Sequence, residues 1–145
     1  MRGCAAFNHL QGDNSEHDLG DCGVVSCADV LNQFGVELTE ADVVRHAQHY
    51  HELHAVVGRP DLSGWTLPAE QAAILTDYGV PAHAEAAQPV GRLAPAVEHG
   101  YGVIAMVNAG VLWSDPRSPG VRSPRWLGAA SVAPTQAGLV RCEHE

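Results

Sequence analysis

The chain has 145 residues, with 8 lysines and arginines against 17 aspartates and glutamates and a formal net charge of −9. This length suits one domain with one core. The composition, with 46% hydrophobic and 17% charged residues, is typical of a globular protein rather than a disordered one. The negative charge argues against nucleic acid and anionic membranes as partners and favours a neutral or cationic peptide.

Targeting signals and cysteine spacing further limit the class of protein to which the chain can belong. The first residues lack the basic start and apolar run of a secretory signal, and no stretch is long and apolar enough to span a membrane, so we expect a cytoplasmic protein. The cysteines lack the paired spacing of a zinc site, and a disulfide framework is not expected without export. They are Cys4, Cys22, Cys27 and Cys142.

Residues 1–18 show no periodicity and are interpreted as an irregular N-terminal arm. A helix is predicted over residues 23–34, because apolar residues recur there at helical spacing, and Gly35 ends it as the C′ residue. Cys22 then lies at the helix N-terminus, where free N–H groups and the helix dipole favour a thiolate. Cys27 lies in the apolar stripe, which predicts a core residue. The stripe is Val24, Cys27, Ala28, Leu31 and Phe34.

The next segment predicts a supporting helix followed by a tract rich in histidine. Thr39 and Asp42 approximate a capping box at the start of this helix. The tract has no HExxH motif, and its histidines fall on two faces, which argues against a metal site. We expect instead a solvated histidine face that gains positive charge as the pH falls through about 6.5. The tract contains His46, His49, His51 and His54.

Residues 55–65 form a predicted loop, and its last residue, Trp65, either lines a substrate groove or packs the loop down. A third helix follows, with Thr66 as its N-cap, Pro68 in its first turn and Gly79 after its end.

The segment after the third helix predicts strands. Residues 80–85 predict an edge strand, because Pro81 cannot donate to a ladder. Residues 93–99 predict a weak helix interrupted by Pro95. Residues 101–108 are apolar on both faces, which predicts the central strand of a sheet.

Two segments resemble a known family: Asp21-Cys22-Gly23-Val24-Val25-Ser26-Cys27 and Thr39-Glu40-Ala41-Asp42-Val43-Val44-Arg45-His46-Ala47. They are similar to papain-like cysteine peptidases of the bacteriocin-processing branch, the double-glycine leader peptidases. The resemblance runs from about residue 19 to residue 115. It implies an α+β, papain-like fold over residues 19–116, in which the cysteine helix packs on a small antiparallel sheet. Residues 117–145 depart from the family and form a tail of uncertain structure.

The resemblance also implies roles for individual residues. Cys22 corresponds to the family's nucleophile, and Asp21, Gly23 and Trp65 would lie along the substrate groove. A glutamine before the nucleophile contributes to the family's oxyanion hole. Here the only glutamine in the N-terminal arm is Gln11, eleven residues before Cys22 and farther than the family places it.

The base that this chemistry requires is missing from its expected place. In the family a histidine opens the strand that follows residues 101–116, but the tail holds only His144, next to the C-terminus. His17 or His99 are the alternative bases. A frameshift near Arg117 is one explanation for the missing C-terminal strands, and translating the source DNA in the other two frames tests it.

The sequence therefore predicts a cysteine peptidase-like domain that hydrolyses peptide bonds through a thioester on Cys22, with impaired activity because the base strand is not found. The alternative is a peptide-binding module on the same fold that does not cut its ligand, and a truncated product without stable function is a further one. We expect no cofactor and no metal. The oligomeric state is left open.

Overall fold

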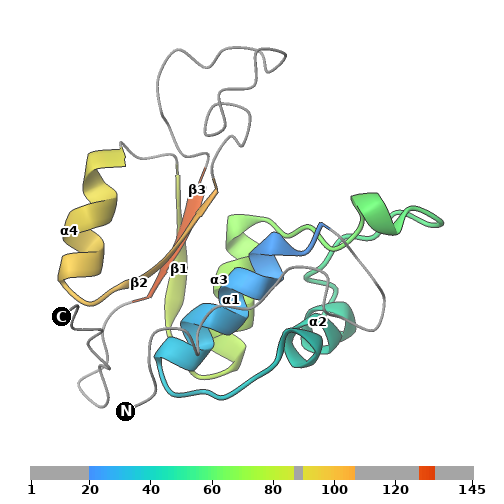
Figure 1. Ribbon diagram of the computed structural model, residues 1–145, viewed down its shortest axis with the longest axis horizontal. Helices are drawn as coiled ribbons and strands as arrows, with labels where there is room; N and C mark the ends of the chain where they lie inside the picture. The colour runs from blue at the N-terminus through green and yellow to red at the C-terminus, as the bar shows by residue number, and fades with distance from the viewer. Residues whose placement is uncertain (1–19, 87–89, 107–127, 133–145) are drawn as a thin grey trace, which may run out of the picture.

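The structure of the chain is a computed structural model, and it describes residues 20–86, 90–106 and 128–132 (Figure 1). Helices and an antiparallel sheet occupy separate regions, so the described fold is α+β. The elements in chain order are α1 (Cys22–Gln33), α2 (Glu40–His49), the short 3₁₀ turn η2 (Pro60–Leu62), α3 (Pro68–Asp77), β1 (Ala82–Ala86), the turn η3 (Val90–Arg92), α4 (Leu93–Glu98), β2 (Gly102–Met106) and β3 (Gly128–Val132).

The three strands pair in the order β1-β3-β2, and both pairings are antiparallel. Ala130 in the middle of β3 lies opposite Ala84 on one side and Ile104 on the other. The central strand of the described sheet therefore comes from residues 117–145, the part of the sequence in which no periodic pattern predicts an element. β3 consists of Gly, Ala, Ala, Ser and Val. The segment is short and its side chains are small, so no hydrophobic pattern predicts a strand there.

β2 confirms the predicted strand in shorter form but not its position. It pairs only with β3 among the described residues and so lies at an edge, which makes the prediction of a central strand wrong. Its sequence is apolar on both faces because helices cover both: α1 packs on one face and α4 on the other (Figure 1). The apolar residues on both faces of β2 thus reflect the helices on either side rather than a central position in the sheet. β1 lies at the opposite edge, as the sequence predicts.

α1 begins at Cys22 and ends at Gln33, and Gly35 follows with a φ of 86°. Its buried surface is wider than the predicted stripe, because Val25 and Val30 are also buried. The reason is that α2, α3 and β2 contact it from different sides. At β2 the approach is close: a Cβ on Gly102 would lie 2.9 Å from atoms of Phe34 and Val30.

The start of α2 confirms the predicted capping box, since Thr39 and Asp42 bond each other's backbone N–H. The start of α3 differs by one residue from the prediction. Leu67 is the N-cap position, and its N–H donates to Glu70 Oε2 at 2.6 Å. The Thr66 hydroxyl instead accepts a hydrogen bond from Gln71 Nε2 at 3.0 Å, so tertiary contact rather than capping uses this side chain.

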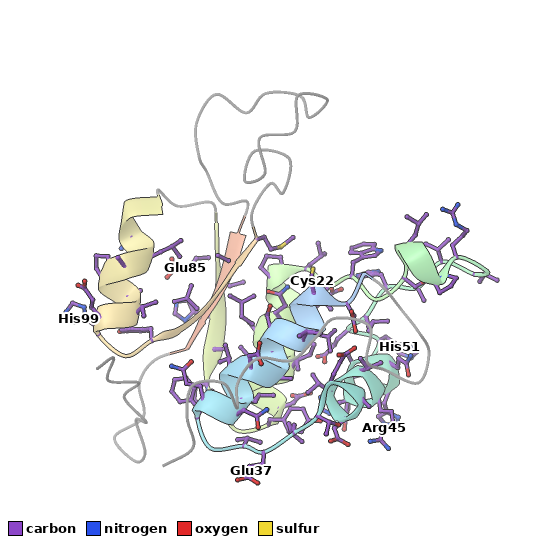
Figure 2. The ribbon with its side chains drawn as sticks, in the orientation of Figure 1. Cys22, Glu37, Arg45, His51, Glu85 and His99 are labelled. Atoms are coloured by element: carbon purple, nitrogen blue, oxygen red, sulfur yellow. The ribbon has the colours of Figure 1, made fainter. Side chains whose placement is uncertain are left out.

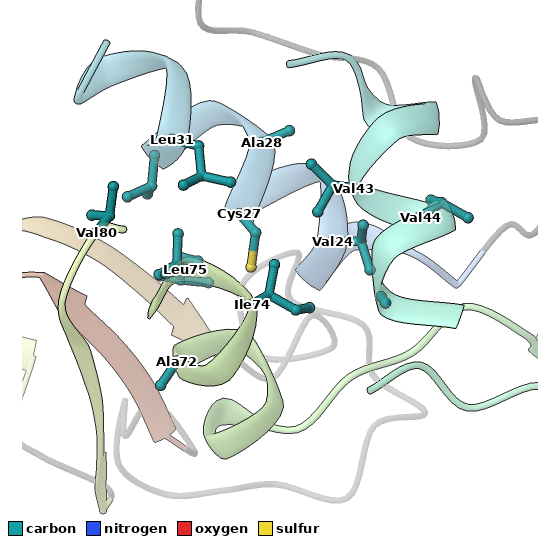
Figure 3. Close-up of a cluster of buried hydrophobic side chains, with 13 residues drawn as sticks. Val24, Cys27, Ala28, Leu31, Val43, Val44, Ala72, Ile74, Leu75 and Val80 are labelled. Atoms are coloured by element: carbon teal, nitrogen blue, oxygen red, sulfur yellow. The ribbon is translucent and has the colours of Figure 1, made fainter. Parts of the chain in front are cut away.

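The core lies between α1, α2, α3 and the sheet (Figure 3). Cys27 is fully buried in it, as predicted, and burial raises the pKa of its thiol well above the usual value. None of the helices in the described ranges is long and apolar enough to cross a membrane. The buried cluster consists of Val24, Cys27, Ala28, Val30, Leu31, Val43, Val44, Ala47, Ala72, Ile74, Leu75, Val80 and Ile104.

Candidate thiol site

Cys22 is the first residue of α1 and its side chain is exposed (Figure 2). The first backbone N–H that bonds back along the helix is that of Val25, which donates to the carbonyl of Asp21 at 2.9 Å. The amides of Cys22, Gly23 and Val24 precede this bond and have no acceptor within the helix. An exposed thiol therefore lies beside N–H donors that the helix itself does not use.

The backbone on both sides of Cys22 is held against the segment that precedes α3. Gly20 donates its N–H to the carbonyl of Ser63 at 2.8 Å, and a Cβ on Gly20 would lie only 2.6 Å from that oxygen. On the other side, a Cβ on Gly23 would lie 2.1 Å from Thr66 Oγ1. Glycine is needed at both positions because side chains have no room there. These contacts determine where the exposed thiol lies relative to residues 63–66.

Gln71 packs against Thr66 and the space at Gly23, and the sequence did not predict this contact. Its side chain is 2% exposed, its Nε2 donates to Thr66 Oγ1, and a Cβ on Gly23 would lie 2.5 Å from Nε2. Its Oε1 is buried without a hydrogen-bond partner in the described part of the chain. Because it is buried, Gln71 positions the first turn of α1 and does not meet a substrate. The signal that could have predicted this role is a polar glutamine next to the apolar Ala72 and four residues before Leu75, on one side of α3.

Trp65 packs against a neighbouring side chain and is also partly exposed. Its ring stacks on His54 with centroids 3.8 Å apart and an interplanar angle of 10°, and His54 Nε2 lies 2.6 Å from Glu70 Oε1. The indole nevertheless stays 42% exposed. It is a packed side chain that still presents an aromatic face to solvent, close in the chain to the segment that holds Gly20. By contrast Asp21 and Gly23, which are also predicted to lie along the substrate groove, are buried.

The structure does not bring His99 to Cys22. His99 follows α4, on the other side of the sheet from α1 (Figure 2), and its Nδ1 donates to the carbonyl of Pro95 at 2.6 Å. It lines a cavity of about 460 Å³ on that far face instead. Gln11 and His17, the other two predicted contributors, lie outside the described residues.

β3 occupies the next strand position after β2 in the described chain, where the family resemblance implies the base. Its first residue, Gly128, lies opposite Met106, the last residue of β2. None of its five residues is a histidine. Among the described residues no histidine bonds to the sulfur of Cys22, so the exposed thiol lies beside unused backbone amides without a visible base.

The histidine tract does not form one face. His49 and His51 are exposed, as predicted. The prediction is wrong for His46 and His54, whose side chains are 16% and 38% exposed and lie against carboxylates of α3. The sequence could not show this, because the partners Asp77 and Glu70 belong to a different helix.

Comparison of the chain with protein-family models, with curated proteins and with solved structures found no match.

Proposed function

We propose that this chain is a cysteine peptidase-like domain in which Cys22 attacks peptide carbonyl groups and turns over slowly for lack of a base. The observation that carries the proposal is the exposed thiol at the first residue of α1, beside amides that no helical carbonyl accepts. The sulfur would form a bond to the carbonyl carbon, and the oxyanion would accept hydrogen bonds from the amide of Cys22. The amine must then leave with a proton, and water must hydrolyse the thioester to release the acid and the free thiol.

The magnitudes decide which of these steps is slow. A helix N-terminus stabilises an anion by about 0.3–1 kcal/mol, or about 2 kcal/mol when partly buried, which is enough to favour the attacking thiolate modestly. General acid–base catalysis contributes about 10²–10⁴-fold, and protonation of the leaving amine depends on it. We therefore expect amide hydrolysis to be slower by about that factor than in an enzyme with a histidine at the sulfur, while attack on substrates with good leaving groups persists.

Acylation by a p-nitrophenyl ester tests the proposal, because nitrophenolate leaves without needing a proton. Mass spectrometry of the intact chain should show one acyl group, mapped to Cys22 by proteolysis and absent in Cys22→Ser. Peptide amides should show little or no turnover. The matched control is Cys27, whose buried thiol should stay unmodified. Iodoacetamide should likewise label Cys22 faster than Cys27, and equally slow labelling of the two would refute an accessible, activated thiol.

A peptide-binding module on the same fold is the second candidate, and the exposed indole of Trp65 favours it. On this alternative, peptides would bind equally well to wild type and to Cys22→Ser, and the ester would not acylate wild type. Trp65→Ala should weaken peptide binding under either candidate, so it tests the groove rather than the choice between the two. Acylation at Cys22 is the result that separates them.

A further inference from the structure

Three side chains, two from α2 and the segment after it and one from the end of α3, converge within the helical layer. His46 lies near the end of α2, Glu52 follows that helix, and Asp77 is the last residue of α3. One ligand atom from each lies within 4.8 Å of the other two. His46 Nε2 is 3.0 Å from Asp77 Oδ2 and 3.9 Å from Glu52 Oε2. We call these residues the His46–Glu52–Asp77 cluster.

The cluster is incomplete as a set of hydrogen bonds. Glu52 Oε2 is buried and has no hydrogen-bond partner in the described part of the chain, since 3.9 Å to His46 is too long for one. His46 Nε2 lies at hydrogen-bond distance from Asp77 Oδ2, which leaves the second carboxylate without a donor from this ring nitrogen. Buried carboxylate oxygens are normally either hydrogen-bonded or bound to a metal.

We propose that the His46–Glu52–Asp77 cluster binds one divalent transition-metal ion of the zinc or manganese class. The three ligand atoms all lie within 4.8 Å of one another, which is close enough for one ion to contact all three after small side-chain movements. Two carboxylates balance the charge of a divalent ion, and Asp77, at 41% exposed, leaves the site open to water for the remaining coordination positions.

The ligand types and their supports select the class of ion. Imidazole nitrogen favours zinc, iron, copper and nickel over magnesium and calcium, whereas the two carboxylates also suit manganese. Tyr50 and Tyr78 pack against the His46 ring, with centroids 4.6 and 4.7 Å away, so two aromatic rings restrict the imidazole. Such an ion would join α2, the segment after it and α3, and would act as a clamp on the helical layer independent of the thiol site.

Isothermal titration calorimetry of the full chain, first freed of metal with a chelator, tests the site. Zn²⁺ should bind with a stoichiometry of one and raise the melting temperature, and Mn²⁺ should compete with it better than Mg²⁺ does. His46→Gln should weaken Zn²⁺ binding at least about tenfold. The matched control is His49→Gln on the same helix, where the ring is exposed and is not part of the cluster, and its Zn²⁺ affinity should be unchanged.

Two further measurements distinguish metal binding at the cluster from misfolding and from binding by cysteines. Asp77→Asn removes one ligand from a partly exposed position without changing its size, so lost binding there cannot be attributed to misfolding if the circular dichroism spectrum is retained. Absorption of the Co²⁺ complex separates this site from the cysteines, because thiolate ligands add an intense charge-transfer band that the cluster cannot produce. The proposal is overturned if Zn²⁺ does not bind, if His46→Gln and Asp77→Asn bind it as tightly as wild type, or if that band appears and disappears in Cys22→Ser.

Discussion

Gly23 is the position at which the candidate thiol site leaves least room for a side chain. A Cβ there would lie 2.1 Å from Thr66 Oγ1 and 2.5 Å from Gln71 Nε2, two groups that are hydrogen-bonded to each other and only 5% and 2% exposed. Neither can move toward solvent. The position of the first turn of α1 therefore depends on the absence of a side chain at Gly23 as well as on hydrogen bonds.

Gly23→Ala should lower the free energy of unfolding by about 1–3 kcal/mol, the usual cost of forcing extra volume into a packed region. Gly91→Ala is the matched control, because a Cβ at that position meets nothing within 4 Å. Urea denaturation of both variants measures the difference. Equal stabilities would show that Thr66 and Gln71 rearrange without cost, contrary to the packing described above.

At the scale of elements, α2 shows how a local signal produces a helix terminus. The Thr39 hydroxyl accepts the N–H of Asp42 at 3.2 Å, and Asp42 Oδ2 accepts the N–H of Thr39 at 3.0 Å. These partners are three residues apart, so the sequence contained the whole motif. For α3 the sequence contained the right boundary signals but not the use of Thr66, which depends on Gln71 and on the approach of Gly23.

Thr39→Ala should cost about 1 kcal/mol of stability, the typical value for losing an N-cap oxygen. The measurement is the urea midpoint at neutral pH. Ser26→Ala serves as a comparison within a helix, because that hydroxyl bonds the carbonyl of Cys22 rather than a free amide. A smaller loss for Thr39→Ala than for Ser26→Ala would contradict the capping role.

The same cap predicts a dependence of stability on pH. Hydrogen bonds from the Thr39 hydroxyl and then from its backbone N–H, aided by Arg45, lower the pKa of Asp42 below 3.8. A carboxyl with a lowered pKa in the folded state stabilises the protein above its unfolded pKa, and this stabilisation is lost as the pH falls through the folded value. Wild type should therefore exceed Asp42→Asn in stability at pH 6, and the gap should close below pH 3.8. A gap that stays constant with pH would mean that the charge is not involved.

At the scale of the whole molecule, the central strand of the sheet comes from a part of the chain that is far in sequence from the first three helices. β3 is hydrogen-bonded to both β1 and β2, which have no contact with each other through hydrogen bonds in the described sheet. Ala130→Pro removes a ladder donor from this central strand and should destabilise the protein by at least about 2 kcal/mol. Ala130→Ser keeps the backbone N–H and is the control. If proline is tolerated in equilibrium unfolding, β3 does not hold the sheet together.

The sequence by itself determined α1, α2 and α3, the position of Cys22 at the start of α1 and the burial of Cys27. Helical periodicity and capping are local, so residues three or four positions apart carry the information. Only the tertiary structure decided that β3 is central, that His99 lies across the sheet from Cys22, and that Gln71 supports the turn at Gly23. The same holds for His46, Glu52 and Asp77, which meet because α2 and α3 pack side by side. These features depend on contacts between residues far apart in the chain, which no local pattern records.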